Sequence, residues 1–177
     1  MSTLGKRATG EDDLQRELRD LLCLAVVGDH LRWVLRGDDA PELIDWLDGA
    51  IAEWRAWADQ VAKQLAALGT APDARVRSLA RDIPVNWVPD GWLEADEGRR
   101  LVSDRLAGVA RWADYRRSQA TGPRAEILDL IYSRLQTQLA GRREIDAAYS
   151  LSGGEQTRTS APQPHVAKEE NSPTTAP

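Results

Sequence analysis

Apolar residues recur at intervals of three and four over four long segments of the chain, roughly residues 11–36, 41–68, 94–119 and 124–147. This spacing places one apolar stripe along each segment and indicates an amphipathic α-helix. The second segment would form a helix roughly 40 Å long. Four long helices, two pairs of which are joined by short links, predict an all-α fold organised as an antiparallel four-helix bundle.

We expect the residues of these apolar stripes to form the core of the bundle. The second segment is the most regular, with Leu43, Leu47, Ala50, Ile51, Trp54, Ala58, Val61, Leu65 and Leu68. The other three segments contribute Leu14, Leu18, Leu21, Leu22, Ala25 and Val26; then Leu101, Val102, Leu106, Val109 and Ala113; and finally Ile127, Leu128, Leu130, Ile131, Leu135 and Leu139. Cys23 lies among the apolar residues of the first segment, which favours a core position.

The first link is a tight turn. Gly37 tolerates the positive φ with which helices commonly end. Either Asp38 or Asp39 can cap the following helix, and Pro41 suits its first turn. One turn before this link, Asp29 and Arg32 are spaced to form an ion pair within the first helix.

The connection from residue 70 to residue 93 is long for a compact domain, and long connections usually have a function. Residues 73–82 read as a short extra helix between the second and third long helices. Proline and glycine residues then break regular structure. Trp87 and Trp92 are interpreted as loop anchors packed on the bundle, with contact to a neighbouring subunit as the alternative.

Composition divides the chain into one domain and two tails. Residues 1–10 are polar and are expected to form a flexible N-terminal tail, residues 11–149 form the bundle, and residues 150–177 are expected to be a disordered C-terminal tail. Neither a signal peptide nor an apolar run of membrane-spanning length is found. A single cysteine suits a reducing compartment, so a cytoplasmic location is expected.

Eight residues between positions 33 and 72 carry a family resemblance: Trp33, Gly37, Leu43, Asp48, Asp59, Leu68, Gly69 and Pro72. Their spacing resembles the signature of the Dps family, ferritin-like shells that protect DNA in starved bacteria. The resemblance implies a ferritin-like bundle with a short helix in the long connection, and a homo-oligomer of twelve subunits. It also implies iron as substrate, stress protection and DNA as a partner.

The family's iron ligands are mostly replaced in this chain. The resemblance puts two histidines, two acids and a glutamate at the two-fold interface between subunits, and only the acids remain, as Asp48 and Asp59. Arg32 and Ile44 stand at the histidine positions, and Lys63 stands at the glutamate position. Iron oxidation needs imidazole and carboxylate ligands around the cation, so no cofactor is expected at this place.

We expect ion pairs to replace the metal. By analogy with the family's site, Arg32 and Lys63 would pair with Asp59 and Asp48 across the subunit interface. Removing one member of a buried network of this kind typically costs about 3–5 kcal/mol. The alternative is that these four side chains are simply solvated.

Four tryptophans near the replaced ligands suggest an aromatic patch. Trp54 lies on the apolar stripe, whereas Trp46 and Trp57 are interpreted as a second face of the same helix, with Trp33 close by. Large aromatic side chains anchor interfaces, so a subunit contact is favoured over a pocket for a flat ligand. His30 points away from the replaced ligand position and is expected to be partly exposed and without a function.

The remaining charges have ordinary explanations. The third long helix carries Arg99, Arg100, Arg105, Arg111, Arg116 and Arg117, which are interpreted as a solvated charged face. Glu126 and Asp129 begin the last helix, where the resemblance implies acids that line a three-fold pore. Acids at a helix start are equally explained by the helix dipole.

Three functions remain open from the sequence. The first is a Dps-like shell without the usual centre for iron oxidation, which would be structural, protective or ligand-binding. The second is an enzyme that oxidises and stores iron at a rearranged site containing Asp48 and Asp59, and the third is DNA binding. The arginine and lysine replacements oppose the second, and a net charge of −5 without a basic arm opposes the third. A further ligand or protein partner could bind the tryptophan-rich face or the C-terminal tail.

Overall fold

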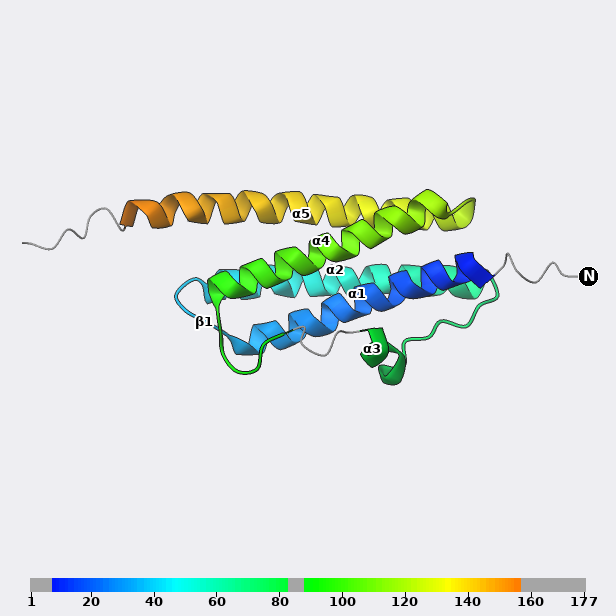
Figure 1. Ribbon diagram of the computed structural model, residues 1–177, viewed down its shortest axis with the longest axis horizontal. Coiled ribbons are helices and arrows are strands. Elements are labelled where there is room, and N and C mark those ends of the chain that lie inside the picture. Colours follow the sequence, from blue (N-terminus) through cyan, green and yellow to red (C-terminus); the bar gives the residue numbers. More distant parts are fainter. Residues whose placement is uncertain (1–7, 83–87, 157–177) are drawn as a thin grey trace, which may run out of the picture.

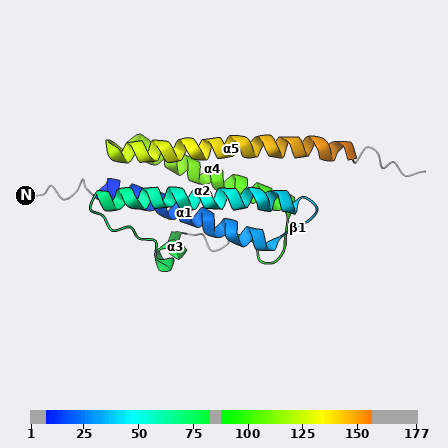
Figure 2. The ribbon, with the colours of Figure 1, turned by 180° about the vertical axis from the view of Figure 1, so that it is seen from behind.

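The computed structural model describes residues 8–82 and 88–156, which form a bundle of four long helices (Figure 1). These helices are α1 (Ala8–Val34), α2 (Ala40–Ala67), α4 (Ala95–Gln119) and α5 (Pro123–Gln156). The short helix α3 (Val76–Asp82) lies in the connection between α2 and α4, as the sequence predicts (Figure 2). None of the described helices combines the length and apolar character that crossing a bilayer requires.

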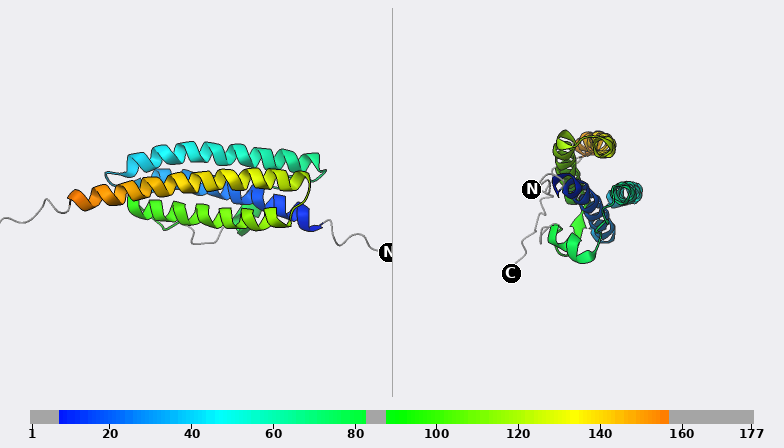
Figure 3. Two further views of the ribbon diagram at one scale, coloured as in Figure 1. Left: turned by 90° about the horizontal axis from the view of Figure 1, so that it is seen from above. Right: turned by 90° about the vertical axis from the view of Figure 1, so that its right-hand side faces the viewer.

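The bundle consists of two helical hairpins. α1 packs mainly against α2 and α4 mainly against α5, whereas smaller contacts of α1 with α4 and of α2 with α5 form the seam between the hairpins (Figure 3). The short links at residues 35–39 and 120–122 force each hairpin to be antiparallel. α3 lies against α1, on the side away from α5 (Figure 1).

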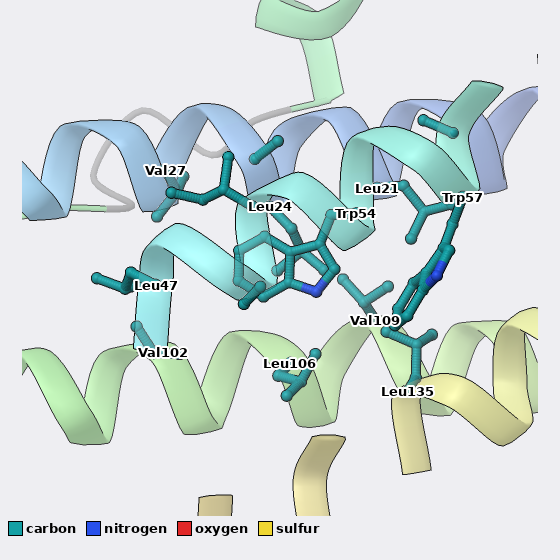
Figure 4. Close-up of a cluster of buried hydrophobic side chains, with 14 of the residues drawn as sticks. Leu21, Leu24, Val27, Leu47, Trp54, Trp57, Val102, Leu106, Val109 and Leu135 are labelled. Carbon is teal, nitrogen blue, oxygen red and sulfur yellow. The ribbon is translucent and has the colours of Figure 1, made fainter. Parts of the chain in front are cut away.

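The apolar stripe of α2 lies in the middle of the core. Trp54, the largest fully buried residue, is 1% exposed and lies between α1 and α4 with Leu24 and Leu106 nearby (Figure 4). Most residues of the four stripes are buried or packed against the core. Val26 and Leu130 are exceptions, since they are 50% and 40% exposed. Each adjoins a buried stripe but points too far around its helix to reach the core.

The turn after α1 has the expected glycine but a different cap. Gly37 has a φ of 104°, and its carbonyl accepts a hydrogen bond of 3.1 Å from the backbone N–H of Ala40. Asp39 occupies the cap position without a side-chain capping hydrogen bond. Its carboxylate lies 3.6 Å from Arg99 on α4, so an ion pair between the hairpins takes the place of the cap.

Two strands of two residues each join the two hairpins at this end. The sequence does not predict them. β1 (Leu35–Arg36) is parallel to β2 (Leu93–Glu94), with Leu35 opposite Leu93. Both leucines are buried. Arg36 and Glu94 form the next pair of opposite residues, and the Nε of Arg36 donates a 2.6 Å hydrogen bond to the carboxylate of Glu94. Such short strands carry too little periodicity to be recognised in a sequence.

A two-way hydrogen bond attaches the start of the long connection to α1. The side-chain amide of Gln15 donates to the carbonyl of Asp73 at 2.8 Å and accepts from its N–H at 2.9 Å. The carboxylate of Asp73 accepts hydrogen bonds from Arg75 and Ser78, which hold the pKa of this carboxyl well below its usual range. The aspartate thus stabilises the start of α3 while its backbone is held on α1.

The helix boundaries differ from the expected ones mainly at the chain ends. α1 begins at Ala8 and includes the end of the expected N-terminal tail, and α5 continues to Gln156 rather than to residue 147. Residues 1–7 and 157–177, and with them most of both expected tails, lie outside the described residues, as does Trp87. Trp92 is 67% exposed, so its interpretation as an anchor packed on the bundle is wrong.

A glycine in α1 permits the close approach of α2. A Cβ built at Gly28 would lie 2.8 Å from Ile51 and 3.1 Å from Trp54. We expect Gly28→Ala to lower the free energy of unfolding by about 1–3 kcal/mol, because overpacking of a core displaces rigid side chains. Urea unfolding followed by circular dichroism measures this loss.

Gly49 in α2 offers the matched control, because a Cβ there would meet no atom within 4 Å. Gly49→Ala is expected to raise the stability by about 0.5–1 kcal/mol through helix propensity alone. Equal effects of the two substitutions would contradict the packing explanation.

Candidate functional site

Arg32, which the sequence predicts to stand at the first replaced ligand position, lies in a row of alternating charges. From the last turn of α1 its guanidinium donates hydrogen bonds to Asp48 on α2 and, at 3.2 Å, to Asp29. Arg55 of α2 donates to the other oxygen of Asp29. The hydrogen bond to Asp48 is the main reason why the pKa of Arg32 is raised above its ordinary value. The predicted pair of Asp29 and Arg32 is confirmed.

The second retained acid is held in a separate pair. The ammonium of Lys63 lies 2.6 Å from Asp59, one helical turn away on α2, and both side chains are largely exposed. Ile44, at the other histidine position, is half-buried and packs against the core. Each retained acid therefore has a basic partner within its own chain, on the surface of the α1–α2 hairpin.

One chain cannot bring the two retained acids together. Asp48 and Asp59 are separated by eleven residues of continuous helix, which corresponds to roughly 16 Å. Within the described ranges, no group of three or more histidine, cysteine, aspartate or glutamate side chains could hold a metal ion. A shared metal at these acids would therefore require a second chain.

The tryptophans do not form one surface patch. Trp54 and Trp57 are 1% and 5% exposed, and Trp46 packs edge-on against Trp54 with ring centroids 6.2 Å apart. The interpretation of two separate faces was wrong, because at about 100° per residue these three side chains fall within an arc of about 80°. The Nε1 of Trp54 donates a 2.8 Å hydrogen bond to Gln138 on α5.

Trp33 is the exception among the four. It is 68% exposed at the end of α1, directly after Arg32. Val26 is 50% exposed and lies two turns earlier on the same side of the helix. The exposed apolar surface near the replaced ligands is therefore made by α1, not by the tryptophans of α2. His30 is exposed nearby, as predicted.

The two pore candidates are both exposed near the start of α5. Asp129 lies 3.3 Å from Arg117 of α4, and the guanidinium of Arg117 also lies 4.2 Å from the centre of the Tyr132 ring. Glu126 is in the first turn of the helix. A pore would again need further copies of the chain, so the pore assignment stays a prediction.

No family model matches this sequence, and no curated protein matches it. Comparison with solved structures gives a different result. The chain superimposes on Dps from Microbacterium arborescens in its high-iron form with a TM-score of 0.73 and 17% identity, covering 83% of this chain and 99% of that one. The fold is that of the Dps proteins. Two further Dps structures show that the likeness does not depend on one neighbour.

Dps92 from Deinococcus radiodurans gives a TM-score of 0.72 and 17% identity, over 76% of this chain and 84% of its own. DpsA14 from Streptomyces coelicolor gives 0.71 and 19%, over 77% and 83%. The Dps-like, ferritin-like fold expected from the sequence is thereby confirmed. Identities this low carry the fold and not the chemistry.

Within this Dps-like chain, the pairs observed are Arg32 with Asp48 and Lys63 with Asp59. The sequence-based expectation is instead a pair of each base with the more distant acid of a second chain. Pairing across an interface stays a prediction, because the structure contains one chain. Since all four side chains already have partners, such pairing would be an exchange between ion pairs.

The sequence does not predict that some charged side chains are buried. Arg99 and Arg116 are each 5% exposed, so two members of the predicted solvated face of α4 lie inside. Glu17 of α1 is 0% exposed and pairs with Arg116. The signal was present in the spacing, because Glu17 continues the stripe of Leu14 and Leu21, and Arg116 follows Ala113 by three residues.

Arg142 of α5 is a third buried arginine, with 0% exposure. Its guanidinium carbon lies 5.4 Å from the ring centre of Trp46. Two contacts therefore join α2 to α5: the guanidinium of Arg142 over the ring of Trp46, and the hydrogen bond from Trp54 to Gln138. Trp46 and Trp54 of α2 therefore belong to the seam between the hairpins.

The contrast between Trp54 and Trp33 can be tested directly. We expect Trp54→Ala to lower the free energy of unfolding by about 3–5 kcal/mol, because it leaves a large cavity in the core. Trp33→Ala is expected to change the stability of a single chain by no more than about 0.5 kcal/mol. Both are measured by urea unfolding at several protein concentrations.

Similar losses for the two variants at every concentration would contradict the assignment of Trp54 to the core and Trp33 to the surface. A loss for Trp33→Ala that grows with protein concentration would mean that a second chain covers Trp33.

Proposed function

We propose that this protein is a Dps-like, homo-oligomeric shell subunit that does not oxidise iron at the family's inter-subunit position and acts as a structural, protective or ligand-binding shell. The observation that carries this proposal is the occupation of both retained acids by basic side chains, Asp48 by Arg32 and Asp59 by Lys63.

The chemistry of these pairs disfavours a ferrous ion. A divalent cation entering at Asp48 or Asp59 would have to displace a guanidinium or an ammonium and then share the site with it. No imidazole is available, because His30 points elsewhere and is the only histidine among the described residues. Hard and borderline cations are held by clustered carboxylates and imidazoles. Two separated carboxylates, each neutralised, do not supply such a cluster.

Assembly into a homo-oligomer is supported by the exposed apolar surface of α1. Trp33 is 68% exposed and Val26 is 50% exposed, and both lie on the same side of α1. Exposed apolar side chains that are grouped on one face mark sites of protein contact. A second copy of the chain would cover them and would bring its own Asp48 and Asp59 to the same region. The number of twelve subunits follows only from the fold family.

DNA binding is the less favoured function. The chain has a net charge of −5 and only two basic residues in its first ten. Affinity for the DNA backbone comes mainly from lysine and arginine side chains that displace counterions. On α4 the buried arginines and those paired with carboxylates are unavailable for phosphate contacts, as Arg99, Arg116 and Arg117 illustrate.

Aerobic oxidation of Fe²⁺ by the metal-free protein tests the chemistry. We expect the wild-type rate to equal the buffer background. The triple variant R32H/I44H/K63E restores the ligand types that the family resemblance implies, and it should gain saturable oxidation. Adding Asp59→Ala to the triple variant is the matched control and should remove the gain.

Fast, saturable oxidation by the wild-type protein, with iron retained, would overturn the proposal and would mean that another site has formed. A triple variant that assembles normally yet stays at background would show that replaced ligands are not the whole reason for inactivity.

The expected interface at Asp59 can be tested through assembly. We expect Asp59→Ala to shift the protein toward smaller species, because it leaves Lys63 and the facing charges of the second chain without their partner. Light scattering during size exclusion measures the mass, with Glu53→Ala, on the same helix, as the control. Unchanged assembly of the Asp59 variant would count against a charged network at the interface.

A further inference from the structure

The seam between α1 and α4 contains a cluster of three charged side chains. The Nη1 of Arg116 lies 2.6 Å from Glu17 Oε2, and its Nη2 donates a hydrogen bond to Asp20. The side chains of Glu17 and Arg116 are 0% and 6% exposed, whereas that of Asp20 is 28% exposed. One base therefore holds two acids from successive turns of α1, and these contacts connect the two hairpins.

The cluster has one acid too many. With both carboxylates ionised it carries one uncompensated negative charge, and Glu17 Oε1 is buried with no hydrogen-bond partner among the described residues. An unpaired charge in a core is costly unless something neutralises it. A second basic side chain, a metal ion or a proton would neutralise the surplus negative charge of the cluster.

A second basic side chain is not at hand. Arg116 and Asp20 are the charged groups that act on Glu17. The basic side chains of neighbouring elements at this end of the bundle are engaged elsewhere: Lys63 with Asp59 on α2, Arg75 with Asp73 before α3, and Arg117 with Asp114 and Asp129. Arg16 is exposed on α1, Arg19 is half-buried on the same helix, and Arg124 is half-buried in the first turn of α5. The basic charge that acts on Glu17 is that of Arg116.

A metal ion does not fit either. Two carboxylates that share an arginine do not make a cation site, and no cluster of three ligand side chains exists within the described ranges. Leu21 and Trp57 lie in one layer of the core (Figure 4). One helical turn further along α2 and α5 from Trp57 and Leu135, the buried residues are the apolar Val61 and Ile131. A proton on Glu17 is the remaining way to neutralise the cluster.

We propose that Glu17, Arg116 and Asp20 form a proton-operated latch between the two hairpins, closed when Glu17 is protonated and weakened when it is ionised. In the closed state Arg116 and Asp20 compensate each other, and the Glu17 carboxyl is neutral in its apolar surroundings. In the ionised state the seam contains the surplus charge. The latch is independent of the positions that carry the proposed function.

The energetics of the carboxyl agree with this geometry. The pKa of Glu17 is raised from 4.5 to about 7, chiefly by burial and also by the charge of Asp20, against the charge and hydrogen bond of Arg116, which lower it. Between pH 4.5 and pH 7 the Glu17 carboxyl therefore binds more protons in the folded chain than in the unfolded chain. Stability from this group is full below that window and is lost as the pH rises through it.

The direct test is a titration of the Glu17 carboxyl carbon by NMR in the full chain. We expect a midpoint near neutrality in the wild-type protein. Asp20→Asn should move the midpoint to lower pH, because it removes the competing acid and leaves Arg116 to Glu17 alone. Asp114→Asn is the matched control, since it removes an exposed carboxylate beside Arg117 and should leave the midpoint unchanged.

The second test measures the latch itself. Between pH 5 and pH 8, the equilibrium constant of unfolding in urea should rise on the order of tenfold to a hundredfold more in the wild-type protein than in Glu17→Gln, which cannot ionise. Hydrogen exchange of the α4 amides around Arg116 should quicken above neutral pH in the wild-type protein alone, after correction for the intrinsic pH dependence of exchange.

Either of two results would overturn the proposal. One is a Glu17 midpoint near the ordinary value of 4.5 in the folded wild-type protein. The other is the same pH dependence of stability in wild type and Glu17→Gln. If Glu17→Gln fails to fold, the Asp20→Asn titration still decides, because a purely structural role of the cluster would not move the Glu17 midpoint downward.

Discussion

Trp54 and the leucines around it occupy the middle of the bundle, and each long helix has to approach α2 closely enough to help cover them. That burial is the interaction on which the other features depend. It brings α1 against α2 through Gly28, where a Cβ would lie 2.8 Å from Ile51 and would displace it. It also brings α4 and α5 over the other side of the stripe, which forces the polar groups at the seam to find partners in one another.

Those partners are specific and differ along the seam. At one end Arg99 lies close to Asp39, and β1 pairs with β2. Between α2 and α5, the indole of Trp54 donates to Gln138. Beside α1, Arg116 bridges two acids. A hydrophobic stripe alone allows neighbouring helices to slide by a turn, whereas polar contacts at fixed heights select one register. We infer that they give the bundle one arrangement.

The sequence predicts the four helices because each has a long, regular apolar stripe, and it predicts the turn at Gly37 because only a few residues tolerate that conformation. It predicts the partner of Asp29 because the pairing is local. It does not predict which acid Arg116 pairs with, because the partner, Glu17, lies almost one hundred positions earlier in the chain. At the candidate site, the spacing of the sequence indicates which residues lie there. It does not indicate which ion pairs form between α1 and α2, such as that of Arg32 with Asp48.

The predicted ligand positions illustrate the same division. The sequence predicts that Arg32 and Lys63 stand where the family has ligands, and their attraction to acids follows from charge alone. Which acid each one takes depends on distances between helices, and the structure gives neighbours within one chain.

The rigid separation of Asp48 from Asp59 has a kinetic consequence. Three turns of uninterrupted helix keep the two carboxylates apart in every conformation that preserves α2. Any process that needs both carboxylates at one point must therefore take them from two different molecules. Until the molecules have associated, its rate depends on the square of the chain concentration. Dilution alone would then separate such a process from one that a single subunit performs.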